Sequence, residues 1–332
     1  MASRCMSFGQ VDLAKPLRVG RFTYRNRVLL APLSGISDVP FRQLAWEAGA
    51  GMVTSEMVAS EALVTGQADM RIKAEGAGLP LHVVQLAGRE PCWMKRAVEV
   101  ASDAGADVID INMGCPAKKV CTGLSGSALM RDLERAERLI ETVLEAFDGP
   151  VTLKMRLGWD DQSINAPELA RRAERAGIAM VTVHARTRNQ FYKGTADWSR
   201  VRPVREEIGI PLVINGDIAT RASAELAMQQ SGADAVMIGR ASCGQPWLSG
   251  EMAGLGRRPG DLAGYVVEHH RRAVEAYGTS GARSFRKHIQ WYGERAGLSA
   301  AMLRPLLTSA DPSRTEDLIH LAFADDKLPV AA

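Results

Sequence analysis

The sequence predicts an α/β protein, a TIM (β/α)8 barrel followed by a small C-terminal helical domain. Three observations lead to this prediction. First, eight short apolar runs recur with helical patterns between them. Second, a motif in which a helix ends in glycine just before a strand is repeated. Third, after Arg240 the sequence shows helical patterns only. Parallel strands covered by helices on both faces typically read as short, continuous apolar runs.

The eight predicted strands are rich in Val, Ile and Leu. They are Val28–Ala31, Met52–Ser55, Leu81–Leu86, Val108–Met113, Val151–Met155, Met180–His184, Leu212–Ile214 and Ala235–Ile238. Helix starts between them are marked by capping residues and by proline in the first turn. These starts are Asp38, Glu90, Pro167 and Thr220, and a further helix is expected from Ser127 to Phe147.

Glycine ends several of these helices just before the next strand, at Gly49, Gly105, Gly177 and Gly232. A glycine at this position is typical of a left-handed C-cap. Repeated units of this kind favour serial βα units, and eight of them close into a barrel. A doubly wound open sheet is the alternative, but no Gly-x-Gly-x-x-Gly follows the first strand.

The predicted domains are a barrel over residues 1–253, a Gly/Arg/Pro-rich linker over 254–260 and a helical domain over 261–332. Helices in the last part are expected at Asp261–Tyr277, Ser284–Ala296, Ala300–Leu307 and Thr315–Ala324.

Charge is nearly balanced over the 332 residues, with 41 basic and 38 acidic side chains. The stretch 257–304 is different, because nine basic and four acidic residues give it a charge of +5. Such a stretch binds a polyanion or forms a solvated helical face, and charge alone does not decide between them.

The five cysteines are odd in number and form no Cys-x-x-Cys pair, which argues against a disulfide framework and against a metal site such as zinc. No apolar run approaches the length of a membrane span. We therefore expect a cytoplasmic protein with no membrane partner.

Polar residues follow all eight predicted strands, at the end where a barrel carries its active site. They are Ser34, Glu56, Gln85, Asn112, Lys154, His184, Asn215 and Arg240, together with the neighbours Cys115, Arg156, Arg186 and Asp217. A barrel without a function would not need such a set.

Cys115 lies in a basic loop after the fourth strand, between Gly114 and Pro116. These two residues restrict the backbone on both sides of the thiol. The alternative interpretation is a small apolar cysteine buried beneath a loop.

Lys154 interrupts an apolar strand, and burying an unpaired ammonium is costly, so we expect it to face the barrel mouth. Asn215-Gly216-Asp217 and Gly239-Arg240 follow strands seven and eight, where barrels often bind phosphate. Taken alone, His184 is as well explained by a structural role. Together the set indicates a flat phosphorylated cofactor, with FMN as the natural candidate.

The chain resembles the tRNA-dihydrouridine synthases, and most of all their bacterial B-type branch. Matching segments keep the family order over nearly the whole chain. They are Ala31-Pro32-Leu33-Ser34-Gly35-Ile36-Ser37-Asp38, Val84-Gln85-Leu86-Ala87-Gly88, Asp110 to Val120, Lys154-Met155-Arg156, Val183 to Arg188, Asn215-Gly216-Asp217, Ile238-Gly239-Arg240 and Arg286 to Tyr292.

This resemblance implies an FMN enzyme that uses NADPH to reduce a tRNA uridine to 5,6-dihydrouridine, with Cys115 as the proton donor. It implies FMN contacts from Pro32, Leu33, Ser34, Gln85, Lys154, His184, Asn215, Gly216, Asp217, Gly239 and Arg240. Asn112 is expected to orient the base, and Arg186, Arg286 and Lys287 to contact the RNA or the uracil edge. The branch suggests a D-loop uridine, position 17, and we expect a monomer.

Three alternatives remain at this point. The first is an FMN-dependent dehydrogenase of a free pyrimidine, which would not need the basic helical segment. The second is a Schiff-base aldolase that uses Lys154, which leaves Cys115 unexplained. The third is a non-catalytic RNA-binding module, against which the presence of both Cys115 and Lys154 argues.

Overall fold

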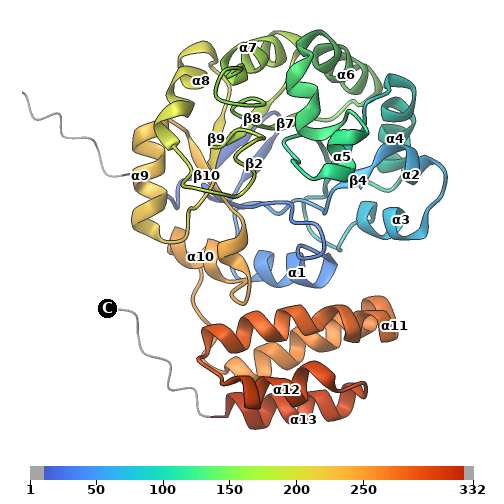
Figure 1. Cartoon of the computed structure of the whole chain (residues 1–332), viewed down its shortest axis with the longest axis vertical. Coiled ribbons are helices and arrows are strands. Elements are labelled where there is room, and N and C mark those ends of the chain that lie inside the picture. The colour runs from blue at the N-terminus through green and yellow to red at the C-terminus, as the bar shows by residue number, and fades with distance from the viewer. Residues whose placement is uncertain (1–10, 325–332) are drawn as a thin grey trace, which may run out of the picture.

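A computed structural model of the chain describes residues 11–324. Its centre is a parallel sheet with the strand order β3-β10-β9-β8-β7-β6-β5-β4. The strands are β3 (Val28–Leu30), β4 (Val58–Ala59), β5 (Val83–Ala87), β6 (Val108–Met113), β7 (Val151–Arg156), β8 (Met180–His184), β9 (Leu212–Asn215) and β10 (Ala235–Ile238). A parallel bridge between Leu30 and Val53 closes the sheet into a barrel, and helices surround it (Figure 1). The predicted fold class is confirmed.

The predicted second strand, Met52–Ser55, is not a regular strand. The N–H of Leu30 donates to the Met52 carbonyl (2.8 Å), whereas the N–H of Ser55 donates to Val83 (3.0 Å). Regular pairing resumes only at β4. The segment bonds to β3 at Met52 and to β5 at Ser55, so neither strand pairs with all of it.

Ten helices of the described chain belong to the barrel part. They are α1 (Val39–Glu47), α2 (Ser60–Val64), α3 (Ala68–Ala74), α4 (Pro91–Asp103), α5 (Lys118–Thr122), α6 (Leu133–Ala146), α7 (Ala166–Ala176), α8 (Arg202–Glu207), α9 (Arg221–Ser231) and α10 (Leu248–Ala253). Asp38 caps α1 by accepting from the Phe41 N–H (3.1 Å), and Thr220 forms a capping box at α9, as the sequence predicts. The glycines that end α1, α4, α7 and α9 all have positive φ.

The helix predicted from Ser127 to Phe147 is divided in two. A 3-10 helix covers Gly126–Arg131, and α6 begins after Asp132. Asp132 has non-helical backbone angles (φ −142°, ψ 86°) and accepts from the Arg135 N–H (3.0 Å), so it caps α6 and interrupts the helix at the same time.

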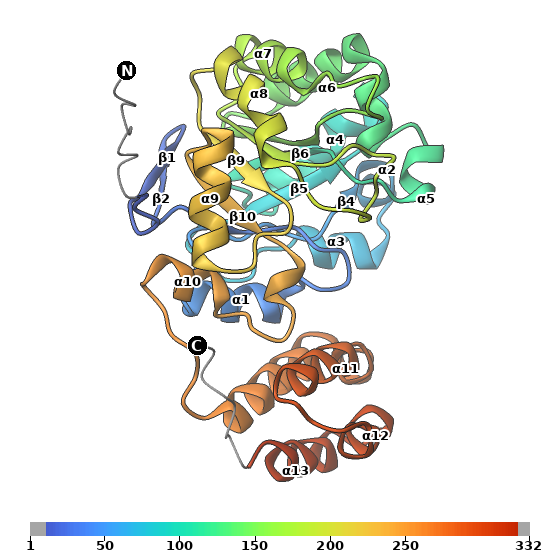
Figure 2. The same ribbon diagram turned by 60° about the vertical axis from the view of Figure 1, so that its left-hand side comes forward.

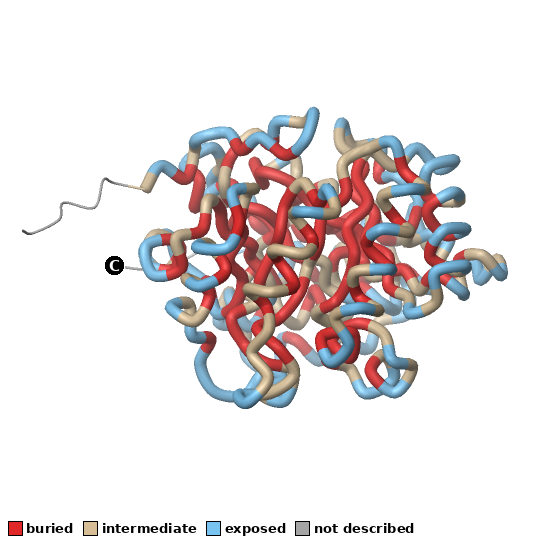
Figure 3. Tube along the Cα trace, turned by 90° about the horizontal axis from the view of Figure 1, so that it is seen from above, coloured by how far each residue is buried: buried red, intermediate tan, exposed pale blue. Residues whose placement is uncertain are grey.

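The barrel interior is arranged in layers because inward-facing side chains alternate along each strand. One end is apolar, with Val83, Val108, Met180 and Val213 packed together. The hairpin of β1 (Leu17–Val19) and β2 (Phe22–Tyr24), which the sequence analysis did not predict, packs on this layer. Figure 2 shows the hairpin at the opposite side of the barrel from α5, and Figure 3 shows the buried interior inside an exposed ring. The hairpin thus closes one end of the barrel.

Three helices follow: α11 (Leu262–Arg295), α12 (Ala300–Thr308) and α13 (Pro312–Phe323). Gly278 kinks α11 (φ 58°, ψ −138°), which accounts for the two separate helices that the sequence predicts there. Residues 254–261 contain no helix or strand. The division into domains at these points stays a prediction. No helix within 11–324 combines the length and the apolar character that crossing a bilayer requires.

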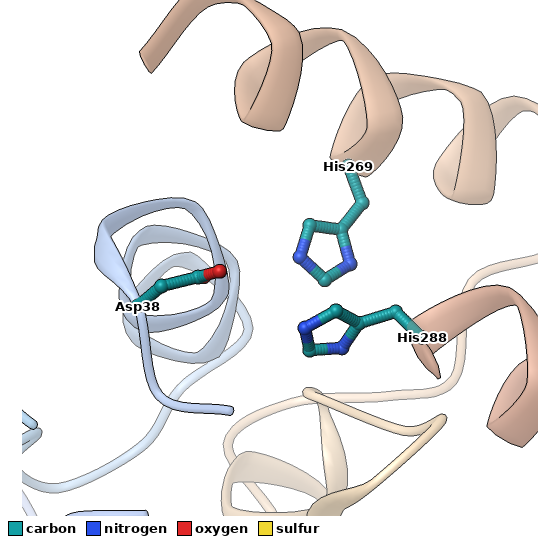
Figure 4. A group of neighbouring side chains, drawn as sticks. All are labelled: Asp38, His269 and His288. Carbon is teal, nitrogen blue, oxygen red and sulfur yellow. The ribbon is translucent and has the colours of Figure 1, made fainter. Parts of the chain in front are cut away.

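The helical part docks on the barrel through a seam between α1 and α11. The seam holds Asp38, His269 and His288, whose side chains approach one another from the two parts (Figure 4). Of the described residues, only this group offers three ligand atoms close enough to share a metal ion. The charges of Lys287 and Arg42 act on Asp38 and oppose a bound cation.

Both seam histidines are buried, and His288 has no hydrogen-bond partner for either ring nitrogen among the described side chains and backbone. Burial lowers the pKa of His288 from 6.5 to about 3. Burial also lowers the pKa values of His82, His184, His269 and His270. The fold therefore requires neutral imidazoles.

We expect the melting temperature to fall between pH 7 and pH 5. In the unfolded chain His288 takes up a proton near pH 6.5, whereas in the folded chain it stays neutral down to about pH 3. The neutral, buried His288 therefore stabilises the fold fully above pH 6.5, and this contribution is lost as the pH falls toward 3. For His288 the loss at pH 5 is about 2 kcal/mol. The pKa of Asp38, raised by burial to about 6, acts in the opposite direction between pH 4 and 6, but the five histidines outweigh it.

Calorimetry at several pH values measures this effect. His288→Leu should flatten the pH dependence. A wild-type melting temperature that stays constant from pH 7 to 5 contradicts the account.

Candidate functional site

A cavity of about 620 Å³ opens at the carboxyl ends of the strands. This volume lies within the range of small-molecule and cofactor sites. Thirteen of the residues singled out from the sequence line it: Pro32, Leu33, Ser34, Gln85, Asn112, Cys115, Lys154, His184, Asn215, Gly216, Asp217, Gly239 and Arg240. The residues that follow the predicted strands therefore come together in one site.

Asn215 is a hub on the cavity floor. Its Oδ1 accepts from Lys154 Nζ (3.3 Å) and lies 2.7 Å from His184 Nδ1, while its Nδ2 donates to the Met237 carbonyl (2.8 Å). The third bond fixes which way the amide faces, so Oδ1 must point toward Lys154 and His184. Nδ1 is then the protonated nitrogen of His184.

The charges of this floor are set mainly by burial. Burial lowers the pKa of Lys154 to about 8, although the carboxylate of Asp110 opposes the change. Burial, with the nearby charges of Arg156 and Lys154, also holds the pKa of His184 far below 6.5. At neutral pH the floor thus presents an ammonium beside a neutral imidazole.

Cys115 is half-buried at the cavity wall. Its N–H donates to Asn112 Oδ1 (2.9 Å), and its carbonyl accepts from Ser127 Oγ (2.9 Å). Burial raises the pKa of the thiol, so it is protonated at neutral pH. The backbone is held on both sides of a thiol that can donate a proton.

Cys121 does not form a disulfide with Cys115, and both are free thiols. Cys121 Sγ instead lies 3.3 Å from Ser127 Oγ and 3.5 Å from the Cys115 carbonyl. It packs beneath the loop that carries Cys115.

An anionic group would fit at the end of the cavity near β9 and β10. Arg240 brings a guanidinium there, and its Nη2 lies 3.4 Å from Asp217 Oδ1. Gly216 has φ of 123°, and a Cβ on it would lie 2.9 Å from the Ala196 Cβ. At Gly239 a Cβ would meet only Leu33, at 3.8 Å, so the backbone there is open to a ligand.

Arg186 does not line the cavity. Its side chain is 1% exposed and donates to Asp217 and to the Gly194 carbonyl (2.7 Å). Burial alone would raise the pKa of Asp217, but the hydrogen bonds from Arg186 and from the Ala196 N–H, with the charges of Arg186 and Arg240, together outweigh it and keep the pKa below its usual value. This placement does not support a direct contact of Arg186 with RNA.

Arg286 and Lys287 also lie outside the cavity. Arg286 Nη2 donates to the Ser309 carbonyl (2.8 Å) and so joins α11 to the chain after α12. Lys287 Nζ reaches the loop after β3, 3.8 Å from where a Cβ of Gly35 would lie. Lys287 is therefore near the rim of the site, and Arg286 serves the packing of the helices.

Two residues of the cavity wall were not assigned a role from the sequence. Arg156 donates to the carbonyls of Gly114 (2.8 Å) and Phe191 (2.9 Å), and so ties the loop of Cys115 to the loop after β8. Tyr192 is exposed, and its ring lies beneath the guanidinium of Arg240, 4.9 Å from ring centre to Cζ. The strand position of Arg156 was a usable signal, whereas nothing in the sequence marks Tyr192.

Comparisons with known proteins agree on one family. The family described as "Dihydrouridine synthase (Dus)" matches residues 29–326. A "Probable tRNA-dihydrouridine synthase" of Rhizobium leguminosarum bv. phaseoli is 55% identical over 303 residues, which cover 90% of this chain and 96% of that protein. "tRNA-dihydrouridine synthase B" of Xanthomonas campestris pv. campestris is 40% identical over 331 residues, covering 95% and 99%.

Solved structures give a likeness of fold alone. The old yellow enzyme from Trypanosoma cruzi aligns with a TM-score of 0.58 at 14% identity, covering 80% of this chain and 97% of that one. An old yellow enzyme homologue from Zymomonas mobilis aligns with a TM-score of 0.51 at 17% identity, covering 71% and 90%.

We expect Gly126→Ala to displace the loop of Cys115. Gly126 has φ of 59°, and a Cβ there would lie 2.8 Å from the Cys115 carbonyl and 3.3 Å from its Cβ. The rate at which iodoacetamide alkylates Cys115 should change several-fold, read by mass spectrometry of the Cys115 peptide.

Gly105→Ala is the matched control. Gly105 also has positive φ (82°), but a Cβ added to it would have no neighbouring atom within 4 Å, so the change costs about 1 kcal/mol of backbone strain and nothing at the site. Equal alkylation rates in the two variants would show that Gly126 does not set the loop.

Proposed function

The chain belongs to the dihydrouridine synthase family, and we propose that it reduces a uridine in the D-loop of tRNA to 5,6-dihydrouridine, with FMN bound in the cavity and NADPH as the electron donor. One observation carries the proposal. A protonated thiol on a fixed loop and a row of amide, ammonium and imidazole groups face the same cavity. This is the arrangement that reduction of a pyrimidine double bond requires.

The residues of the cavity fit FMN. Gln85, Asn112 and Lys154 can hydrogen-bond the polar edge of a flat ring, and the open backbone at Gly239 with the guanidinium of Arg240 suits a phosphate next to Gly216. Pro32, Leu33, Ser34, His184 and Asp217 would complete the contacts. FMN held by these residues would supply hydride chemistry, in its reduced form, to C6 of the uracil.

Cys115 would then give its proton to C5 of the same ring. Its thiol suits general acid catalysis because burial raises its pKa and keeps the proton in place at neutral pH. Asn112 holds the Cys115 N–H, so it positions the donor and lies where it can orient the base. A uridine within a folded RNA must leave its stack to reach the thiol.

The helical part would hold the tRNA backbone, but with fewer cations than the charge of +5 on residues 257–304 indicates. Arg271 and Arg272 are paired with Glu316 and Glu47, at 2.8 and 2.7 Å. Arg295 donates to the Ala241 carbonyl (2.8 Å). Exposed Arg283 and the rim residue Lys287 are the better candidates for RNA contact.

For the finer assignments we propose uridine 17 as the target, because a B-type synthase is among the relatives. The enzyme would act as a monomer in the cytoplasm, where tRNA is modified.

An absorbance spectrum tests the cofactor and the substrate together. We expect flavin bands that NADPH bleaches and that unmodified tRNA restores, with dihydrouridine detected in the RNA by mass spectrometry. Recovery with free uridine but not with tRNA would instead support a dehydrogenase of free pyrimidines. A protein that cannot be reconstituted with FMN would overturn both.

Cys115→Ala should retain the flavin bands and NADPH oxidation but lose at least about 100-fold in dihydrouridine formation, because general acid catalysis typically contributes that much. Cys121→Ala is the control, since Cys121 lies beneath the loop and outside the cavity lining. Product formation at the wild-type rate in Cys115→Ala would remove the thiol from the mechanism.

A further inference from the structure

Asp110 lies one layer beneath the cavity floor and was given no role by the sequence analysis. Its side chain faces the barrel interior from β6 and is 5% exposed. The strand register sets it beside Gln85 of β5 and Thr152 of β7. Thr152 Oγ1 donates to Asp110 Oδ1 (2.6 Å), and Gln85 Nε2 donates to Oδ2 (2.7 Å). Each carboxylate oxygen therefore has a donor.

A chain of hydrogen bonds runs from this carboxylate to Cys115. Because a carboxylate only accepts, Gln85 must turn its NH2 group toward Asp110. Gln85 Oε1 then accepts from Asn112 Nδ2 (2.8 Å). Asn112 Oδ1 is thereby left to accept from the N–H groups of Gly114 (3.2 Å) and Cys115 (2.9 Å). One negative charge thus determines the direction of two amides and of the loop beyond them.

The strand register brings Asp110 near Lys154, because Asp110 pairs with Thr152 and Asn112 pairs with Lys154, so both side chains face the barrel interior from neighbouring strands. Five groups act on or touch Lys154: Asp110 from β6, Arg156 from its own strand, Cys115, His184 from β8 and Asn215 from β9. Asp110 is the carboxylate among them, and it opposes both the burial of Lys154 and the charge of Arg156. Burial raises the pKa of Asp110 itself, and the hydrogen bonds from Thr152 and Gln85 and the charge of Lys154, which favour the ionised form, offset only part of this rise.

We propose that Asp110 is the positioning residue of this site: its carboxylate orients the Gln85 and Asn112 side chains and is the counter-charge beside Lys154 on the neighbouring strand. Asp110 touches neither the cavity nor a ligand in it, and acts only through these three residues. Its effect on turnover rests on the proposed reduction of uridine, whereas its effect on Lys154 does not.

The direct test is the titration of Lys154. Acetic anhydride modifies the free amine, so the extent of acetylation of Lys154 between pH 6 and 10, measured by mass spectrometry on the whole protein, gives the midpoint. Asp110→Asn should lower this midpoint by roughly 0.5–1 pH unit, because the counter-charge is lost while the shape is kept. Turnover on tRNA should show kcat reduced roughly ten-fold with KM for tRNA nearly unchanged.

Two further variants make the test independent of the folding of Asp110→Asn. Thr152→Val removes one donor from Asp110 and should lower the midpoint by a smaller step in the same direction. Tyr24→Phe is the matched control. The charge of Asp110 acts on the Tyr24 hydroxyl, but that buried hydroxyl has no hydrogen-bond partner in the described chain. Removing it should leave the midpoint unchanged.

A Lys154 midpoint in Asp110→Asn equal to that of the wild type overturns the proposal. If Asp110→Asn does not fold, equal midpoints in Thr152→Val and Tyr24→Phe overturn it in the same way. A wild-type protein that makes no dihydrouridine, but whose Lys154 midpoint moves as expected, refutes the proposed function and retains the role of Asp110.

Discussion

The site depends on the parallel register of β5, β6 and β7. Gln85 pairs with Asp110, Asp110 with Thr152, and Asn112 with Lys154, and side chains in such pairs face the same side of the sheet. In a closed barrel that side is the interior. Polar residues two apart along each strand therefore stack as a polar column above the apolar layer, and the column ends at the cavity.

The sequence was sufficient for the barrel and for most of the site. Strand-end residues such as Asn112 and Lys154 could be placed because each follows or interrupts an apolar run whose direction is known. The prediction of a regular strand at Met52–Ser55 was wrong because the two halves of this segment pair with different neighbouring strands. The hairpin of β1 and β2 was missed because two three-residue strands give too short a pattern to detect.

Charged residues were harder to assign than amides. Arg186 follows a strand just as Asn215 does, yet its long side chain turns back to Asp217 and is buried. Similarly, Arg272 and Arg295 belong to a basic segment but bind the barrel or its carbonyls. A guanidinium has five donors, and whether they meet RNA, an acid or a carbonyl depends on partners distant in the chain, which periodicity does not reveal.

The hairpin that packs against Val83 and Val108 also has a kinetic consequence. In the described part of the chain that end of the barrel is filled, and the cavity beside Cys115 opens at the rim formed by the strand-end loops. A dinucleotide that delivers electrons and an RNA that receives them would then need the same entrance. Under the proposed function the two half-reactions would alternate, with the first product leaving before the second substrate enters, which is a ping-pong order.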